Sequence, residues 1–421
     1  MSEIQANWRE RELSLDEVIS KYPDVSPFVI LKIDVQRRGV DFSQRAIDAV
    51  DTEQDAVLWR GIYSAEKKDL TPNGLLLRDG TTIIANRVRE EERTLYGGTV
   101  PYLVDVVDGK TVLTDDGRVL EEVEYWRKPD YFDKATSNGT PMWQLLVIRP
   151  QRVDINIYQN CDFWKLGGLG CRFCTIASTF NETKSVKTEF LDSREIAEAV
   201  AEALKQQGRY RMIQFCAGSI LGGDELLDDE VDRYIDLLQH LEGIFGPKKI
   251  LTQLIGTAYN ERQLRRLYDE TILTSYTADI EVLDEDIFNW ICPGKAKYIG
   301  YNGWKERLYR AADIFGPNAV NTGIVSGVEL ATPNGFKTED EALEKGLKEA
   351  EVLARHDVGI AQTVFRPTKG SYFQRQKPAS LDYLTAFAKG LDAIQRKYRM
   401  EVYYDDYRTC GNHPNTDLAR I

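Results

Sequence analysis

The sequence has few cysteines and histidines, and it lacks any long apolar run. Six cysteines in 421 residues are too few for a fold built on disulfides. The three histidines are His240, His356 and His413, all far in sequence from the cysteines within residues 161–174. This shortage disfavours zinc enzymes and histidine-based hydrolases. No apolar run approaches the ~20 residues that cross a bilayer, so a membrane partner is not expected.

Basic residues are also in deficit, with 54 Lys and Arg against 67 Asp and Glu, which gives a net charge of −13. An acidic surface repels phosphate backbones, so nucleic acid is disfavoured as a partner. The first residues contain no apolar signal core, so a cytoplasmic protein is expected. A content of 42% apolar and 29% charged residues indicates a globular chain. The oligomeric state cannot be derived from these features.

Residues 1–142 are predicted to form an N-terminal α+β domain that is rich in hairpins. Ser14 and Glu17 form a capping box that opens a short helix, and a second helix is expected at residues 41–51. Apolar runs further on are separated by Asp-Gly pairs at residues 79–80, 108–109 and 116–117. Such pairs suit the twist of two-residue antiparallel hairpins. Nothing in this region indicates a chemistry.

From residue 143, strand and helix patterns alternate, which predicts a parallel sheet with right-handed crossovers. The expected strands are Val153–Tyr158, Met212–Cys216, Ile250–Ile255, Ser275–Val282, Ala319–Ser326 and Gly359–Phe365. Six such units predict an α/β fold with a partial (β/α)6 barrel at residues 143–400. The tail, residues 401–421, is polar and aromatic, and we expect it to pack on the barrel rather than line its cavity.

Three cysteines, Cys161, Cys171 and Cys174, follow the first predicted barrel strand on a glycine-rich loop. Loops at this end of a barrel build active sites. Three thiolates can bind three irons of a [4Fe–4S] cube and leave the fourth iron open. The alternatives are a zinc loop with a remote fourth ligand such as Cys216 or Cys410, and buried cysteines without a metal.

This loop resembles the cluster loop of the radical S-adenosylmethionine (SAM) superfamily. The usual family spacing is C-x3-C-x2-C with an aromatic residue just before the last cysteine. Cys171, Phe173 and Cys174 reproduce the second half of that pattern. Cys161 precedes Cys171 with nine residues between them, which matches a minority C-x9-C-x2-C variant.

The resemblance extends to two further strand ends and implies a SAM site. Gly222, Gly223 and Asp224, after the second strand, resemble the turn that takes the methionine amino group of SAM. Glu281, at the end of the fourth strand, occupies the position of a polar residue that meets the ribose. Each feature alone is also an ordinary turn or strand-end carboxylate, so the inference depends on their order after the cysteine loop.

The fifth strand resembles the family element that packs on adenine. This resemblance assigns an adenine contact to Val325, and Phe173 is assigned to the cofactor site by its place in the cysteine loop. Glu329 follows the second glycine of the element one residue early, so its match is weaker. The glycines of this strand are also consistent with tight packing alone.

The resemblance implies a radical SAM enzyme with a [4Fe–4S] cluster and SAM as cofactors. Such an enzyme cleaves SAM reductively to a 5′-deoxyadenosyl radical, which abstracts hydrogen from a small-molecule substrate. The outcome is a rearrangement, formation of a C–C or C–S bond, or an oxidation. A reductant such as flavodoxin or ferredoxin is implied as a partner. The alternatives are an RNA or peptide substrate, and a metal-stabilised binding protein without catalysis.

No residue is identified as catalytic from the sequence, and three weak candidates remain. Cys216 could donate a hydrogen atom to a product radical, although a core position is favoured for it. Arg366, after the sixth strand, could meet an anionic substrate, and Tyr404 lies in the aromatic tail. A second cluster is disfavoured because Cys216, Cys292 and Cys410 are isolated in the sequence. No D-x-H-x-x-G cobalamin motif occurs.

Overall fold

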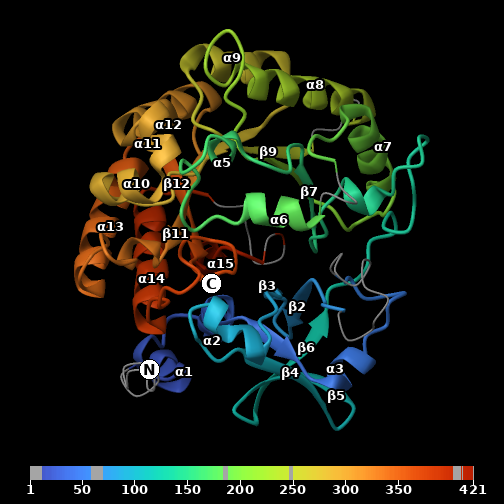
Figure 1. The fold of residues 1–421 in the computed structure, drawn as a ribbon, viewed down its shortest axis with the longest axis vertical. Helices are drawn as coiled ribbons and strands as arrows, with labels where there is room; N and C mark the ends of the chain where they lie inside the picture. The colour runs from blue at the N-terminus through green and yellow to red at the C-terminus, as the bar shows by residue number, and fades with distance from the viewer. Residues whose placement is uncertain are drawn as a thin grey trace.

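The computed structural model describes residues 12–57, 70–183, 188–245, 250–401, 409 and 411–420. Within these ranges the chain forms two six-stranded sheets. Figure 1 shows the sheet of the N-terminal residues below the larger, curled sheet, which carries helices on its outer side. The predicted domain boundaries, 1–142, 143–400 and 401–421, stay predictions.

The N-terminal sheet has the strand order β1-β4-β5-β6-β2-β3. Its strands are β1 (Val40–Phe42), β2 (Gly74–Leu77), β3 (Thr82–Ile84), β4 (Tyr102–Val107), β5 (Lys110–Asp115) and β6 (Arg118–Tyr125). The turns at residues 108–109 and 116–117 join β4 to β5 and β5 to β6, with positive φ at all four residues. That conformation is the type I′ turn that Asp-Gly favours. The predicted hairpins are therefore confirmed.

Three helices accompany this sheet: α1 (Leu15–Lys21), α2 (Pro27–Arg38) and α3 (Gln44–Asp48). The capping box of Ser14 and Glu17 at α1 is confirmed. The helix expected at residues 41–51 is wrong at its start, because β1 takes those residues and only α3 is helical. The sequence analysis missed α2. Its buried residues include charged ones from several sides of the helix, so α2 lacks the apolar stripe that identifies a surface helix.

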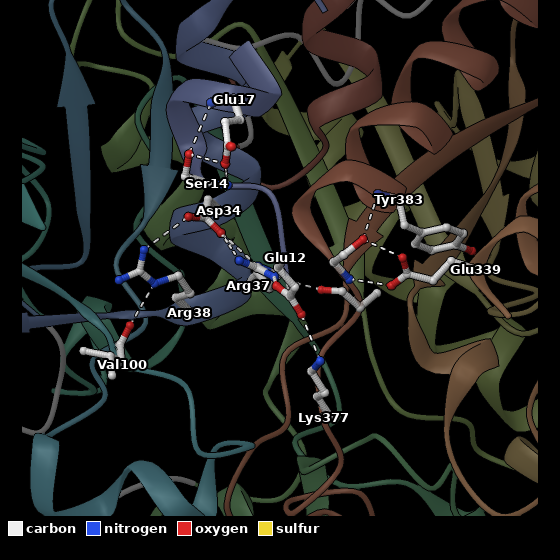
Figure 2. A network of polar contacts seen from close by, with 12 residues as sticks. Glu12, Ser14, Glu17, Asp34, Arg37, Arg38, Val100, Glu339, Lys377 and Tyr383 are labelled. Atoms are coloured by element: carbon white, nitrogen blue, oxygen red, sulfur yellow. Dashed lines mark hydrogen bonds and ion pairs between the residues drawn. The ribbon is translucent and has the colours of Figure 1, made fainter. Parts of the chain in front are cut away.

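Buried ion pairs hold α2 in place (Figure 2). Asp34 accepts from Arg37 Nε at 2.8 Å and pairs with Arg38 at 3.3 Å. Arg37 also pairs with Glu12 at 2.8 Å, and Glu12 pairs with Lys377 at 3.0 Å. Burial opposes ionisation of Asp34, yet the two guanidinium groups lower the pKa of this carboxyl. The network thereby connects α2 to Lys377, which lies in the segment before the last long helix of the barrel.

The second sheet is parallel throughout, with the order β12-β11-β10-β9-β8-β7. Its strands are β7 (Arg152–Asn156), β8 (Met212–Cys216), β9 (Leu251–Gly256), β10 (Ser275–Ala278), β11 (Val320–Ser326) and β12 (Val358–Val364). Because β7 and β12 are the two edges, the barrel is open, and the predicted partial (β/α)6 barrel is confirmed. β10 ends earlier than predicted, and Glu281 beyond it has a φ of 71°.

Helices cover the outer side of this sheet (Figure 1). Two short helices, α5 (Asp162–Lys165) and α6 (Ile176–Thr183), belong instead to the loop that follows β7. The outer helices are α7 (Ser193–Ala203), α8 (Asp228–Phe245), α9 (Glu261–Glu270), α10 (Glu285–Ile291), α11 (Pro293–Tyr298), α12 (Tyr301–Phe315), α13 (Glu339–Ala354) and α14 (Leu381–Lys397). Their apolar faces and the strands share one core. In the part of the chain that is described, no helix is long and apolar enough to span a lipid bilayer.

The end of the chain returns to the barrel through α15 (Pro414–Asp417), which contacts α14, β12 and α2. Asp417 pairs with Lys32 of α2 at 2.7 Å, and both side chains are almost fully buried. Asn415 accepts from the Gln362 N–H on β12 at 2.7 Å. These contacts place the terminal residues between the barrel and the N-terminal sheet.

Candidate active site

The cysteine loop begins where β7 ends, at the edge of the open barrel. Cys161 is the residue before α5, and the chain then returns through Cys171 and Cys174 to α6. Cys161 is buried, whereas Cys171 and Cys174 are half-buried. Phe173 is half-buried and packs against the barrel core.

The pKa values of the Cys161 and Cys174 thiols are affected by neighbouring cysteines of the loop. Burial raises the pKa of Cys161 to about 11, Cys171 adds to that shift, and the backbone N–H of Ser219 opposes it. Burial, followed by the charges of Cys171 and Cys161, raises the pKa of Cys174 to about 12. The Ile176 N–H donates to Cys174 Sγ at 3.5 Å. A bound metal cation would lower these pKa values and favour the thiolates.

The loop after β8 lies directly against Cys161. A Cβ on Gly218 would stand 2.0 Å from the Asn160 carbonyl oxygen and 2.5 Å from Cys161 Cβ. Asp162 joins the two loops, because its N–H donates to Ser219 O and its carboxylate accepts from the Leu221 N–H, both at 2.9 Å. The sequence analysis missed Gly218. Its one signal was a glycine two residues after the predicted second strand.

The turn at Gly222, Gly223 and Asp224 lies further along the same loop and is exposed. Gly223 has a φ of 114°. The Gly222 carbonyl accepts from the Asp229 N–H of α8. The next residue, Glu225, accepts from Asn260 and Arg262 beside α9. The recorded contacts of this turn therefore run toward α8 and α9, and its role in SAM binding stays a prediction.

Glu281 lies within range of the cysteines for electrostatic interaction. Its charge acts on the thiols of both Cys171 and Cys174. Lys295 pairs with Glu281 at 2.7 Å and donates to the Asp279 carbonyl at 2.6 Å. Burial raises the pKa of Glu281 to about 7, and Lys295 opposes that shift. A carboxylate held in this way at a strand end is able to accept hydrogen bonds from a ligand at the barrel mouth.

Val325 and Glu329 are placed differently from each other. Val325 lines the same interior cavity as Glu281. Both carboxylate oxygens of Glu329 accept from the Gly327 N–H at 2.8 Å, and the Tyr383 hydroxyl of α14 donates to Oε1. Glu329 thus connects β11 to a helix outside the sheet, and its predicted cofactor role gains no support from these contacts.

The interior of the barrel is polar where a packed barrel would be aliphatic. Gln214 donates to Gln253 at 2.7 Å, Gln253 donates to Thr277 at 3.0 Å, and Thr277 donates to Asn321. The adjoining cavity has a volume of about 40 Å³ and includes His413 of the tail in its lining. The tail therefore lines the cavity as well as packing on the barrel, which the sequence analysis did not favour.

The chain is similar to one curated protein and to several solved structures. No family model matches the chain. Methylornithine synthase matches with a TM-score of 0.40 and 13% identity, over 61% of this chain and 71% of that one. A radical SAM methyltransferase from Sphaerobacter thermophilus matches with a TM-score of 0.40 and 15% identity, over 95% and 97%.

A bacteriochlorophyllide c C-7(1)-hydroxylase from Chlorobaculum limnaeum is 25% identical over 302 residues, which are 66% of this chain and 67% of that protein. The comparisons bear out the resemblance of the cysteine loop to the radical SAM superfamily. The similarity supports an enzyme, and radical SAM relatives imply SAM and an iron–sulfur cluster as cofactors.

The surroundings of the three cysteines are compatible with a cluster-binding loop. Among the described residues, no three His, Cys, Asp or Glu side chains are arranged around one metal position. In a cube each cysteine binds its own iron, so the sulfurs stand further apart than the ligands of one ion. Backbone N–H groups already point at the sulfurs of Cys161 and Cys174, as around cluster thiolates.

The three weak catalytic candidates lie in different surroundings. Cys216 Sγ donates to Asn156 Oδ1 at 2.5 Å inside the barrel, and burial raises its pKa to about 12. Arg366 lies 5.3 Å from the ring centre of Tyr96, and burial lowers its pKa to about 10. Within the described ranges, Arg366 Nη1 has no hydrogen-bond partner. Tyr404, like Cys410, lies outside the described residues.

Proposed function

We propose that Cys161, Cys171 and Cys174 bind three irons of a [4Fe–4S] cluster and that the enzyme cleaves SAM reductively. Bound together, these cofactors supply a 5′-deoxyadenosyl radical that abstracts hydrogen from a small-molecule substrate. The observation that carries the proposal is that the cysteine loop after β7 is bonded through its backbone to Ile291 and Gly294, and that Lys295, next to Gly294, pairs with Glu281 beyond β10 at 2.7 Å. The loop and Glu281 lie at the active-site face of a barrel.

The protein's own task is to hold and shield the reactants. Glu281, fixed by Lys295, is positioned to accept from the ribose hydroxyls, and Val325 offers an apolar contact for adenine. Gly222, Gly223 and Asp224 remain the predicted site for the methionine amino group, with Phe173 beside the cluster.

Among the possible outcomes, we put oxidation of a C–H bond first, because the curated relative is by name a hydroxylase. In such a reaction SAM is the oxidant and water supplies the oxygen atom. The substrate R–H, the SAM cation and hydroxide give R–OH, methionine and 5′-deoxyadenosine, so atoms and charge balance. An unpartnered Arg366 Nη1 supports a substrate that carries an anionic group. Flavodoxin or ferredoxin is the proposed reductant.

The test is anaerobic reconstitution with iron and sulfide, followed by SAM and dithionite, with 5′-deoxyadenosine measured by chromatography. Formation by the wild type and not by Cys171→Ala supports the proposal. Absence of the nucleoside with four irons bound contradicts reductive cleavage by the enzyme alone. Purification with zinc in place of iron would favour the binding-protein alternative.

A further inference from the structure

The segment that joins β12 to α14 lies between the N-terminal part of the chain and the cysteine loop. The Gly97 N–H donates to Gln374 O of this segment at 3.2 Å, and a Cβ on Gly97 would stand 2.8 Å from Pro367 Cγ. On the other side, a Cβ on Gly370 would stand 2.5 Å from the Ser178 hydroxyl oxygen of α6. Because α6 directly follows the cysteine loop, this segment forms part of the barrel mouth.

Arg366 of this segment is held against the N-terminal part of the chain. It is the second residue after β12, at the end of the barrel where active sites are built. Its guanidinium carbon lies 5.3 Å from the ring centre of Tyr96, the residue before Gly97. A cation within about 6 Å of an aromatic ring is attracted to it. Because Tyr96 is buried, its ring is a fixed support for the guanidinium group.

The guanidinium group of Arg366 has no carboxylate partner in the part of the chain that is described. Its Nη1 is enclosed and has no hydrogen-bond partner there. Burial lowers the pKa of Arg366 to about 10, and among the described residues Tyr96 is the only group whose charge opposes this shift. By contrast, the buried Arg38 pairs with Asp115 at 2.7 Å and with Asp34 at 3.3 Å. An enclosed cationic donor without an acceptor costs free energy, so we expect its partner to come from outside the chain.

We propose that Arg366 is a substrate-binding residue that pairs with a carboxylate group of the substrate, with Tyr96 as its support. The inference rests on the proposed function, because it assigns the substrate class of the same site. The Arg366 side chain is only half-buried, so a ligand can reach it. Its planar fork of N–H donors matches a carboxylate. Its one uncompensated positive charge balances one negative charge, whereas a phosphate dianion would bring a second negative charge to a chain of net charge −13.

The experiment measures the midpoint of thermal unfolding of the reconstituted enzyme, anaerobically and at one scan rate, in increasing sodium acetate with sodium chloride keeping the ionic strength constant. We expect the wild-type midpoint to rise as acetate binds the folded state, and Arg366→Met, which removes the charge, to lack this rise. Arg375→Met removes an exposed arginine of the same segment. It is the matched control and should respond like the wild type. Tyr96→Phe keeps the ring and should keep the response, whereas Tyr96→Leu should weaken it.

The possible results are distinct. No rise in the wild type, an equal rise in Arg366→Met, or loss of the rise in Arg375→Met as well overturns the assignment. A rise that depends on Arg366 but is larger with inorganic phosphate than with acetate would make the ligand a phosphate and overturn the carboxylate class. Equal responses in Tyr96→Phe and Tyr96→Leu overturn the role of Tyr96. A wild type that responds to acetate but forms no 5′-deoxyadenosine would contradict the proposed function and not the anion site.

Discussion

Gly218 lies so close to Cys161 that a methyl group on it would stand 2.5 Å from the Cys161 Cβ. The same methyl group would be 2.0 Å from the Asn160 backbone oxygen, which is too close for relaxation of one side chain to relieve. The first cysteine and the loop after β8 are therefore built as one unit. Substitutions in either loop are expected to affect both.

Gly218→Ala should displace Cys161 and lower the iron bound per chain after reconstitution. Overpacking of this kind costs ~1–3 kcal/mol, so the midpoint of urea unfolding should fall as well. Gly243→Ala in α8 is the control, because its added Cβ meets nothing within 4 Å. It should bind iron like the wild type and gain ~0.5–1 kcal/mol. Wild-type iron content in Gly218→Ala would show that the loops are not coupled.

Asp224→Ala tests the turn that the family resemblance predicts. If its carboxylate takes the amino group of SAM, removal should weaken SAM binding about tenfold or more, because hydrogen bonds to charged groups contribute ~1.5–3 kcal/mol. Binding is measured by calorimetry on the reconstituted enzyme, with iron content at the wild-type level. Unchanged affinity would indicate that the amino group of SAM binds elsewhere, at Ala217–Ser219, which lie next to Cys161.

Asp34→Asn should destabilise the protein by about 3 kcal/mol, because it leaves two buried guanidinium groups with less negative charge. This loss of stability is at the low end of the range for breaking a buried ion pair, because Arg37 keeps its ion pair with Glu12 and Arg38 keeps its ion pair with Asp115. Urea unfolding measures it. Asp16→Asn breaks an ion pair that is exposed on both sides and should cost no more than ~1 kcal/mol. If both variants lost the same free energy of unfolding, burial would not explain why the ion pairs of Asp34 stabilise the protein.

Glu230 gives a prediction for the pH dependence of stability. It is buried in α8 and accepts from the backbone N–H groups of Ile220 and Thr257 and from the Tyr259 hydroxyl. Burial raises the pKa of this carboxyl above its usual value, although these bonds oppose the shift. The folded state then binds the proton more tightly than the unfolded state, so this contribution to stability is lost as the pH rises above ~4.5.

Glu230→Gln removes the titrating group, so the wild type should lose stability relative to the variant as the pH is raised from about 4.5 toward neutrality. Urea unfolding of both proteins over that range measures the difference. Glu341→Gln is the control for a solvent-exposed carboxyl whose pKa is lowered by Lys345, and its trend should have the opposite sign. A constant difference between wild type and Glu230→Gln would contradict the raised pKa.

The barrel could be predicted from the sequence because each strand is a local signal. Its six strands are short apolar runs, and helix caps such as Asn260 and Asp284 mark where the following helices begin. The Asp-Gly hairpins were equally local. The helix α2 was not predictable in this way, because its buried charges are satisfied by partners as distant as Asp417. When a residue pairs with another one hundreds of positions away, the sequence around it contains no signal of that partner.

The sequence by itself indicated a superfamily and a type of cluster, through the spacing of Cys161, Cys171 and Cys174. That was possible because all three predicted ligands lie on one short loop, so their spacing can be seen in the sequence. Only the tertiary structure decided which other residues meet that loop. It placed Gly218 against Cys161, directed the contacts of the Gly222 turn toward the outer helices, and connected Glu329 to α14. Those relationships depend on how strands and crossover helices pack, and packing joins residues whose separation along the chain carries no signal.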